Sequence, residues 1–482
     1  MALFYLGNEF VDRVKSGGEK LTLRNPVDDS VIADDVPVAG TEDVDRAVAL
    51  GREAFRRGPW AKFTGIQRSA CLNKFADLVE KNVERLAYAE SLPTGRPVAG
   101  IIHFDLAHMV QVYRCWADKI GGESFGEDNG FAKIVRYKPL GVCAGIASWN
   151  STFMYIGWKL APALAAGNTV IFKPSEKSPL GVLALAPLFA EAGFPPGVVQ
   201  FVTGGRETGS LLAFTGSIAA GKAVQEAATR SNLKKTTLEL GGSLQPWCSK
   251  TLTSRLLLGG LFTALISRCT GLNFGTVLPG GSLQIPAKSV SESIADKFLA
   301  AAKAFSKALE HNGRSPLELS TSHGPVVDKL QFDRIMSYID KGKASAQLLT
   351  GGKRLGSKGC FVEPTLFVNP DSQSPIWKEE IFGPVLTVRT FKTEEEAIYM
   401  ANDSIYGLAA CVYTCDVSRA LRVSAALDTG GVSINSPYLP ELNTPFGGIK
   451  QSGQGRELGA HGLYSYLEPQ SVHIRVPEAS KL

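Results

Sequence analysis

The chain has 482 residues, of which 44% are hydrophobic and 20% are charged, and its formal net charge at pH 7 is +5. This length exceeds what one hydrophobic core usually holds, so we expect two or three soluble domains. The small net charge, with no long basic run, argues against nucleic-acid or membrane partners. The apolar run LLLGGLFTALI is about half of what a bilayer span needs.

In chain order, the first predicted elements are helices over 41–57 and 64–90. Thr41 is the expected N-cap of the first helix, because the acidic residues that follow it suit the positive end of a helix. In the second stretch, apolar residues recur at helical spacing and predict a buried face.

From residue 141 the pattern becomes that of an α/β domain. The short apolar runs GVCAGIA, TVIFK and GVVQFV are separated by predicted helices at 153–166 and 178–192. Strands buried on both faces and alternating with helices indicate a parallel sheet. The runs AACVYT, DVSRALRVSAAL and GGVSIN repeat this alternation and predict a second α/β unit. The stretches GEDNGFAKIVRYKPLG and YLEPQSVHIRV predict ribbon strands outside both units.

The end of the run TVIFK carries candidate nucleotide contacts. A carboxylate such as Glu176, just past a parallel strand, can accept both hydroxyls of a ribose, and Lys173 can donate to the same sugar. The alternative is a solvated loop. No G-x-G-x-x-G follows a first strand, but GGRETG and FTGSIAAG could present backbone N–H groups to a pyrophosphate. A plain glycine turn explains either stretch equally well.

Two polar residues lie where apolar runs end. Asn150, in ASWNSTF, could donate its amide to a developing oxyanion, although asparagine also favours the N-cap of a helix and both roles can coexist. Glu239, in TTLELGG, ends an apolar run, where a carboxylate is costly unless it has a chemical role.

Taken together, several ordered motifs carry a family resemblance. They are ASWN…WKLAPALAAGNTVIFKPSEKSP, AGFPPGVVQFVTG, FTGS, SNLKKTTLELGG, EEIFGPVLTV, GLAACVYT and NTPFGGIKQSGQGRELG. With them the chain resembles the NAD(P)-dependent aldehyde dehydrogenase superfamily. The resemblance implies a Rossmann-type parallel-sheet NAD-binding domain (1–121 and 141–242), a second α/β catalytic domain (243–461), and a small β oligomerisation ribbon with the C-terminal tail (122–140 and 462–482).

The resemblance also implies site residues and a reaction. Glu239 is similar to the general base and Asn150 to the oxyanion donor. The residues similar to the family's cofactor contacts are Lys173, Glu176, Gly216, Ser217, Glu380 and Phe382. An acid at 176 disfavours a 2′-phosphate, so NAD is expected over NADP. A cysteine thiolate would add to an aldehyde, expel hydride to NAD, and leave a thioester that water hydrolyses. The alternative is an inactive relative that binds nucleotide or serves as a structural subunit.

The segment 243–290 departs from that pattern. The family's Asn-x-Gly-Gln-x-Cys string is absent, and three ways of placing the nucleophile point near Asn273, near Ser282 and at Cys269, while Cys248 is too close to Glu239. Read one base earlier, 243–254 can encode Gln-Ser-Pro-Ala-Met-Val-Phe-Lys-Asp-Ala-Asp-Leu. In the same frame 284–290 can encode Thr-Asn-Thr-Gly-Gln-Val-Cys. A frame-shifted segment is therefore our hypothesis, with the cysteine codon straddling Ser289 and Val290, and it predicts poor packing there.

Two further departures accompany it, of which the second is the milder. About a turn of helix and the start of a strand are missing before FTGS, and Ser148 stands where the family commonly has proline before Trp-Asn.

The cysteines and the last residues of the sequence predict the cellular compartment of the protein. The eight cysteines show no CxxC pair and no zinc spacing, so free thiols in a reducing compartment and no metal site are expected. Ser480, Lys481 and Leu482 match the signal read by the peroxisomal import receptor, which predicts a peroxisomal protein, with the cytoplasm as the alternative. The resemblance further implies a homodimer or homotetramer, in which 122–140 pairs with the strand near 465–475 of a neighbour.

Overall fold

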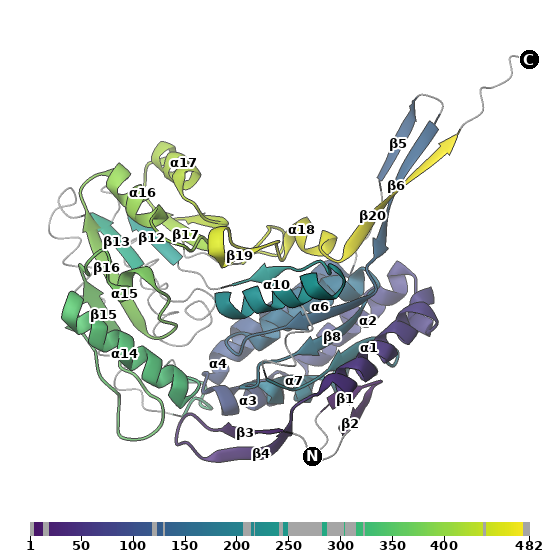
Figure 1. Ribbon diagram of the computed structural model, residues 1–482, viewed down its shortest axis with the longest axis horizontal. Helices are drawn as coiled ribbons and strands as arrows, with labels where there is room; N and C mark the ends of the chain where they lie inside the picture. Colours follow the sequence, from purple (N-terminus) through teal and green to yellow (C-terminus); the bar gives the residue numbers. More distant parts are fainter. Residues whose placement is uncertain are drawn as a thin grey trace, which may run out of the picture.

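The computed structural model describes residues 4–12, 19–117, 123–128, 131–205, 214–215, 217–240, 244–248, 282–286, 303, 315–321, 323–436 and 440–475. They form two lobes, each built on a mostly parallel sheet, and a narrow ribbon that projects from the first lobe (Figure 1). The predicted α/β class with a separate ribbon is confirmed.

The first lobe contains an eight-stranded sheet in the order β19-β11-β10-β7-β8-β9-β1-β2. Its central strands are parallel, and the outer strands pair antiparallel with their neighbours. In chain order the strands are β1 (Phe4–Leu6), β2 (Glu9–Val11), β7 (Val142–Ile146), β8 (Thr169–Lys173), β9 (Val199–Phe201), β10 (Phe214–Thr215), β11 (Leu238–Glu239) and β19 (Gly453–Gln454). After β7 the chain adds β8 and β9 on one side and β10 and β11 on the other. The sheet therefore reverses its winding between β7 and β10, where ligands of open α/β sheets usually bind.

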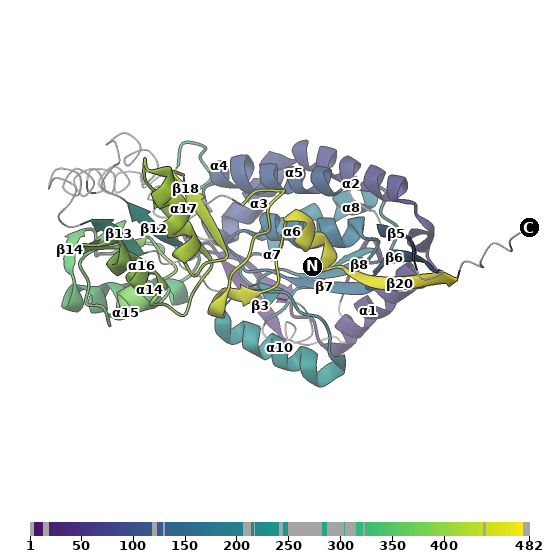
Figure 2. The same cartoon turned by 90° about the horizontal axis from the view of Figure 1, so that it is seen from above.

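Helices cover both faces of this sheet. Helices α1 (Thr41–Arg56) and α10 (Ile218–Asn232) lie on one face, and α6 (Thr152–Ala165) on the other, with α2 (Gly65–Glu80) and α5 (Ala107–Trp116) packed behind α6 (Figure 2). Because α6 is enclosed between the sheet and these helices, it is buried along its whole length, which explains its nearly all-apolar sequence. The remaining elements of this lobe are β3 (Lys20–Arg24), β4 (Val31–Pro37), η1 (Pro59–Lys62), α3 (Val83–Thr94), α4 (Val98–Gly100), η2 (Ile101–Leu106), α7 (Pro179–Leu185) and α8 (Pro187–Glu191).

The two N-terminal helix predictions need small corrections. The N-cap of α1 is Gly40 and not Thr41, and the carboxylate of Asp43 accepts a hydrogen bond from the Gly40 backbone N–H at 2.9 Å. The single helix predicted over 64–90 is two helices, α2 and α3. Asn82 lies between them and donates its side-chain amide to the Leu78 carbonyl at 2.8 Å, which satisfies an acceptor at the end of α2 and lets the chain turn.

The second lobe contains a seven-stranded sheet in the order β14-β15-β16-β13-β12-β17-β18, parallel except for β14. The elements are β12 (Leu244–Cys248), β13 (Ser282–Pro286), α14 (Lys329–Ser345), β14 (Gln347–Thr350), β15 (Thr365–Val368), α15 (Pro375–Lys378), β16 (Val385–Phe391), α16 (Glu394–Asn402), β17 (Ala409–Tyr413), α17 (Val417–Ala426) and β18 (Gly431–Ile434). The described parts of the divergent segment 243–290 are thus central strands. Within β12, Pro246 stands opposite Cys411 of β17.

The predicted end of the second domain at residue 461 is too late. After β18 the chain returns to the first lobe, through η3 (Lys450–Ser452), β19 and α18 (Gly459–Tyr464). Strand β19 pairs with β11, and α18 packs on α6. The segment that carries β19 and α18 therefore belongs physically to the first lobe.

The ribbon has three antiparallel strands, β5 (Glu123–Asp128), β6 (Phe131–Pro139) and β20 (Leu467–Arg475), in the order β20-β6-β5. The predicted pairing of 122–140 with a neighbour's C-terminal strand is wrong in its partner, because β6 pairs with β20 of its own chain from Leu467 opposite Pro139 to Arg475 opposite Phe131. Both edges of β6 are occupied within one chain. An association between chains would have to use β5, β20 or another surface.

Candidate functional site

Asn150 and Glu239 lie beyond the same edge of the first sheet. Phe214 of β10 is level with Ile146 of β7 and with Leu238 of β11, so Glu239 and the residues after Ile146 extend from the carboxyl ends of strands that flank β10. Adjacent strands are about 4.8 Å apart, so β7 and β11 are separated by about twice that spacing. The sheet topology brings the two predicted catalytic residues into one neighbourhood.

The side-chain amide of Asn150 is buried and held by two hydroxyl groups. Ser148 Oγ donates to Asn150 Oδ1 at 2.5 Å, and Asn150 Nδ2 donates to Tyr155 Oη at 3.2 Å. Burial raises the pKa of Tyr155 well above the usual value for tyrosine, so its hydroxyl keeps its proton at neutral pH. The N-cap of α6 is Ser151, and it makes no side-chain cap hydrogen bond. The alternative role of Asn150 as the N-cap is therefore not what the structure shows.

The carboxylate of Glu239 is buried, with only 5% of the residue exposed. Neither of its oxygens makes a hydrogen bond of ordinary geometry within the described residues, although the backbone of Gly448 lies beside it. Burial, and next the negative charge of Glu457, raise the pKa of Glu239 well above the usual value for glutamate, while Lys159 and Arg456 act in the opposite direction. A carboxyl group held in this way can accept a proton near neutral pH.

Two residues that the sequence analysis did not single out complete this cluster. Lys159 of α6 and Glu457 form a buried ion pair, with Nζ 2.5 Å from Oε1. The Lys159 ammonium also lies 5.9 Å from the centre of the Tyr155 ring, whose hydroxyl contacts Asn150. A connected set of side chains thus leads from Asn150 to Glu457, whose charge acts on Glu239. The sequence did contain a signal for Lys159, because burying a lysine within the apolar stretch FMYIGWKLAPALA is costly unless its charge is paired.

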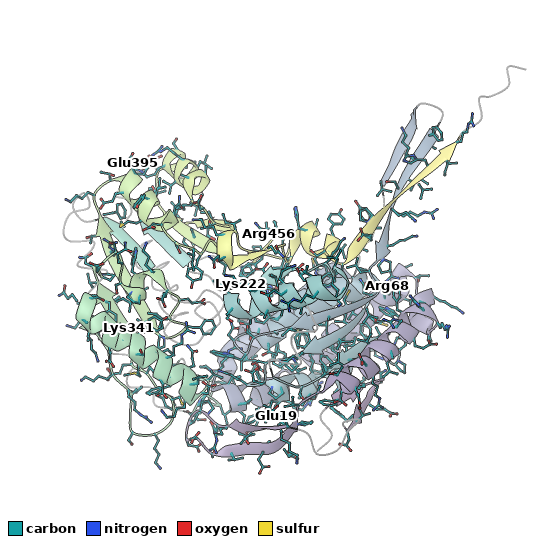
Figure 3. The ribbon with its side chains drawn as sticks, in the orientation of Figure 1. Glu19, Arg68, Lys222, Lys341, Glu395 and Arg456 are labelled. Carbon is teal, nitrogen blue, oxygen red and sulfur yellow. The ribbon has the colours of Figure 1, made fainter. Side chains whose placement is uncertain are left out.

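The backbone around Glu239 comes from the end of the chain. A Cβ atom on Gly447, whose φ is +152°, would lie 2.6 Å from Glu239 Oε1, so only glycine leaves room for the carboxylate. Arg456 donates from Nη1 to the carbonyls of Gly448 and Gly455 and so holds this loop in place. Figure 3 shows Arg456 in the segment beside β19, at the junction of the two lobes.

The predicted ribose contacts lie at the carboxyl end of β8. Lys173 is the last residue of the strand and is buried, and its ammonium donates to the neighbouring Pro174 carbonyl at 3.0 Å. Burial lowers the pKa of Lys173, an effect that the charge of Glu176 opposes. Glu176 is half-buried and accepts from Ser175 Oγ at 3.4 Å. The two side chains therefore remain close together beyond the strand.

Of the two predicted pyrophosphate contacts, Ser217 is the N-cap of α10, and its Oγ accepts from the Ala220 backbone N–H at 3.3 Å. Gly216 lies outside the described residues. The first turn of this 15-residue helix has the backbone N–H groups that an anion requires.

Glu380 and Phe382 belong to a loop of the second lobe that is tied to α14. Arg334 donates to the Glu380 carbonyl at 2.9 Å, and Gln331 donates to the Phe382 carbonyl at 3.0 Å. The Phe382 ring makes an edge-on contact with Trp149, with ring centres 5.2 Å apart. Because Trp149 directly precedes Asn150, this contact places the second lobe against the oxyanion candidate.

A second bridge joins the lobes next to this contact. Lys177, which follows Glu176, lies 2.6 Å from the carboxylate of Asp328, the N-cap of α14. Its ammonium is 5.9 Å from the centre of the Trp149 ring. The loop after β8 and the loop that carries Phe382 are thus fixed to one another.

Within the part of the chain that the structure describes, no nucleophile candidate lies at this site. Cys248 is in β12 of the second sheet, opposite Tyr413, whereas Glu239 is in the first sheet. Ser282 begins β13. Cys269, Asn273, Ser289 and Val290 lie outside the described residues, as do Ser480, Lys481 and Leu482. Among the described residues, no cluster has the side chains to hold a metal ion, and no helix is both long and apolar enough to cross a membrane.

Comparison with known proteins identifies the fold and the chemistry. The model of the aldehyde dehydrogenase family matches residues 13–245 and 286–472. This chain belongs to the aldehyde dehydrogenase family. The match omits residues 246–285, which fall within the segment where the sequence analysis found the departure.

Individual relatives extend over nearly the whole chain. An aldehyde dehydrogenase from Emericella nidulans is 40% identical over 98% of this chain and 95% of its own. Aldehyde dehydrogenase 1A1 from Rattus norvegicus is 39% identical, with the same coverage of both chains. The solved NAD⁺ complex of an aldehyde dehydrogenase from Bacillus cereus is 35% identical, covers 98% of this chain and 96% of its own, and has a TM-score of 0.90. The chain is therefore an aldehyde dehydrogenase by fold and by family, and the inactive alternative is not favoured.

Proposed function

We propose that this aldehyde dehydrogenase oxidises an aldehyde to the carboxylic acid with NAD⁺, using Asn150 as the oxyanion donor and Glu239 as the general base. The observation that carries the proposal is the buried set of contacts from Asn150 through Tyr155 and Lys159 to Glu457, beside Glu239. These groups lie beyond the point between β7 and β10 where the strand order of the first sheet reverses, and a bound dinucleotide and an aldehyde could meet there.

The residues at the edge of β8 suit NAD. The Lys173 ammonium can donate three hydrogen bonds and makes one described bond, to its neighbour's carbonyl, so it has capacity for a ribose hydroxyl. Glu176 supplies acceptors for the same sugar, and its negative charge would repel a 2′-phosphate. Ser217 would place the start of α10 against the pyrophosphate, and Glu380 and Phe382 would contact the nicotinamide half. Bound NAD⁺ supplies the acceptor for the hydride.

In the proposed reaction, a cysteine thiolate adds to the aldehyde carbonyl, and the oxygen takes up negative charge that the Asn150 amide stabilises. Collapse of this adduct restores the carbonyl and releases hydride, which leaves a thioester. Glu239 then takes a proton from water, which attacks the thioester, and the carboxylic acid departs as the thiolate is regenerated. The raised pKa of Glu239 suits this proton transfer.

The proposal is tested by following NADH formation with a panel of aldehydes. The wild-type protein should reduce NAD⁺ and prefer it to NADP⁺, and Glu176→Gln should narrow that preference. Asn150→Ala should lower kcat by about 100-fold, the usual cost of an oxyanion donor. NAD⁺ binding without turnover of any aldehyde would favour the inactive alternative.

We infer that the segment 243–290 arises from a shifted reading frame. Two observations support this: the family match omits 246–285, and Pro246 occupies the interior of a central strand, where proline is unfavourable. Sequencing the transcript across codons 236–300 tests the inference. A transcript that encodes this chain in one continuous reading frame would contradict the inferred frame shift and would leave Cys269 as the nucleophile candidate.

We propose that the protein forms a homodimer or homotetramer. The ribbon of β5, β6 and β20 supports this, because it projects from the body (Figure 1). Apolar side chains of its strands, such as those of Phe131 and Ile474, are exposed. Light scattering coupled to size-exclusion chromatography should give the mass of a dimer or tetramer. A Phe131→Lys, Ile474→Lys variant that shifts to the monomer would place the ribbon in the interface.

We propose that the tripeptide Ser480-Lys481-Leu482 acts as a peroxisomal address when it ends a chain. A fluorescent protein that ends in residues 471–482 should enter peroxisomes, and the same fusion without Leu482 should stay in the cytosol. Cytosolic fluorescence from both fusions would contradict the proposal.

A further inference from the structure

The hydroxyl group of Ser148 makes the shortest contact to the Asn150 side chain. Its Oγ donates to Asn150 Oδ1 at 2.5 Å, across two positions of the loop between β7 and α6. Asn150 is 2% exposed and Ser148 is half-buried, so this hydrogen bond is partly shielded from water. Such a bond limits the rotation of the amide more than a fully exposed one would.

The orientation of this amide decides whether it can act on an oxyanion. Only the Nδ2 end can donate, and a half-turn of the amide would put the Oδ1 acceptor where negative charge develops. The terminal torsion of asparagine is broad and nearly two-fold, so it does not select one orientation. The selection has to come from the groups that surround the amide.

Ser148 and Tyr155 both contact the amide, but only the Ser148 contact is made to one end of it alone. Ser148 engages Oδ1, while Tyr155 Oη lies 3.2 Å from Nδ2 and 3.3 Å from Oδ1. The tyrosine ring is fixed in turn by an edge-on contact with Trp158, with ring centres 5.9 Å apart. With Oδ1 engaged by Ser148, the donor end of the amide is turned away from that hydroxyl.

We propose that Ser148 is a positioning residue, whose hydroxyl holds the Asn150 amide with its nitrogen presented to the substrate oxygen. This inference rests on the proposed role of Asn150 as the oxyanion donor. Ser148 itself touches neither the substrate nor the cofactor in this role.

The test compares Ser148→Ala, Ser148→Thr and the control Ser151→Ala. Ser151 is a buried serine that directly follows Asn150, and its hydroxyl donates to the Asn150 backbone carbonyl at 2.8 Å and not to the side-chain amide. Ser148→Ala should lower kcat/KM for the aldehyde about three- to tenfold, the value of one hydrogen bond, with an unchanged Kd for NAD⁺ and an unchanged melting temperature. Ser148→Thr, which keeps the hydroxyl, should recover most of the loss, and Ser151→Ala should lose less than about twofold.

A second readout does not depend on turnover. In protein labelled with ¹⁵N-asparagine, the side-chain NH₂ signals of Asn150 are those missing from Asn150→Asp. Ser148→Ala should shift or broaden them, and Ser148→Thr and Ser151→Ala should leave them close to the wild-type positions.

The two readouts separate the possible failures. If Ser148→Ala alters the NH₂ signals but the wild-type protein oxidises no aldehyde, the contact between Ser148 and the amide stands and the proposed function is overturned. An active wild type whose kcat/KM and NH₂ signals are unaffected by Ser148→Ala would overturn the inference. Equal losses in Ser148→Ala and Ser148→Thr, with equal falls in melting temperature, would also overturn it, because they would indicate a packing role.

Discussion

Lys159 and Glu457 are 298 residues apart in the chain and form a buried ion pair of 2.5 Å beside Glu239. The pair contributes to the electrostatic environment of the proposed general base, because, after burial, Glu457 raises the pKa of Glu239 further and Lys159 lowers it. The three groups act as one set, so a change in any of them should be visible in the pH dependence of the reaction.

Glu457→Gln should shift the acid side of the kcat–pH profile to lower pH. The substitution removes a negative charge that raises the pKa of Glu239, and it leaves the positive charge of Lys159 without its partner. Glu239 would then lose its proton more readily. Breaking a buried pair costs about 3–5 kcal/mol, so the profile is measured well below the variant's melting temperature. The exposed Glu395→Gln, in the other lobe, is the control, and an unchanged profile in Glu457→Gln would contradict the assignment.

Glu239→Gln should separate the two halves of the reaction. The amide cannot accept a proton from water, so hydrolysis of the thioester should slow by about 100-fold or more, whereas hydride transfer should continue. Rapid mixing should show a burst of NADH of about one equivalent per active site, followed by little steady-state turnover. Loss of the burst together with the turnover would assign Glu239 a role in the first half of the reaction.

Because the carboxyl group of Glu90 is buried, we expect the protein to lose stability as the pH rises. This carboxyl group is fully buried, and neither oxygen makes a hydrogen bond of ordinary geometry within the described residues. Burial raises the pKa of Glu90 to about 8, against the opposing effects of Thr152 and Arg96. Between the unfolded pKa of about 4.5 and the folded value, the native state binds a proton that the unfolded state does not, so the free energy of unfolding falls across this window.

Glu90→Gln should remove that dependence, because the amide resembles the protonated acid and does not ionise. The variant should match the wild type near pH 5 and exceed it by about 1 kcal/mol or more above pH 8. Denaturant unfolding at several pH values measures this. Glu84→Gln, at the first turn of the same helix α3, is the control. A difference in free energy of unfolding between Glu90→Gln and the wild type that stays constant from pH 5 to above pH 8 would contradict the raised pKa of Glu90.

Pro246→Val should stabilise the second lobe. Strand β12 has neighbours on both sides, so a backbone N–H at residue 246 would face another strand whichever way it pointed, and proline supplies none. Restoring the backbone N–H at residue 246 should raise the free energy of unfolding by about 1 kcal/mol. Pro375→Val, at the first position of α15 where proline is favoured, should bring no gain. A lower melting temperature for Pro246→Val would mean that this strand tolerates the proline.

Much of the fold could be predicted because its signals are local. The runs TVIFK and AACVYT are mostly apolar, which predicted strands buried on both faces, and β8 and β17 are buried at every residue. The break between α2 and α3 was missed because the apolar stripe continues past Asn82. What stops the helix is a side-chain hydrogen bond that periodicity does not register.

The site was predictable in part for the same reason. Asn150 and Glu239 stand out because each is a polar residue at the end of an apolar run. The residues that orient and charge them do not share this local signal. Ser148 was noted only as a departure from the family's usual proline, and Glu457 becomes relevant only when the chain returns to meet Lys159. The ribbon partner was missed in a similar way, because pairing within a chain and pairing between chains have the same sequence pattern.

The return of the chain after β18 also sets the order in which the protein can be completed. The glycines around Glu239, the carboxylate of Glu457 and strand β19 are all made in the last part of translation. While the ribosome is still synthesising the second lobe, β11 is an open sheet edge and Lys159 has no counter-charge. The nascent first lobe is therefore unfinished until almost the entire polypeptide has emerged.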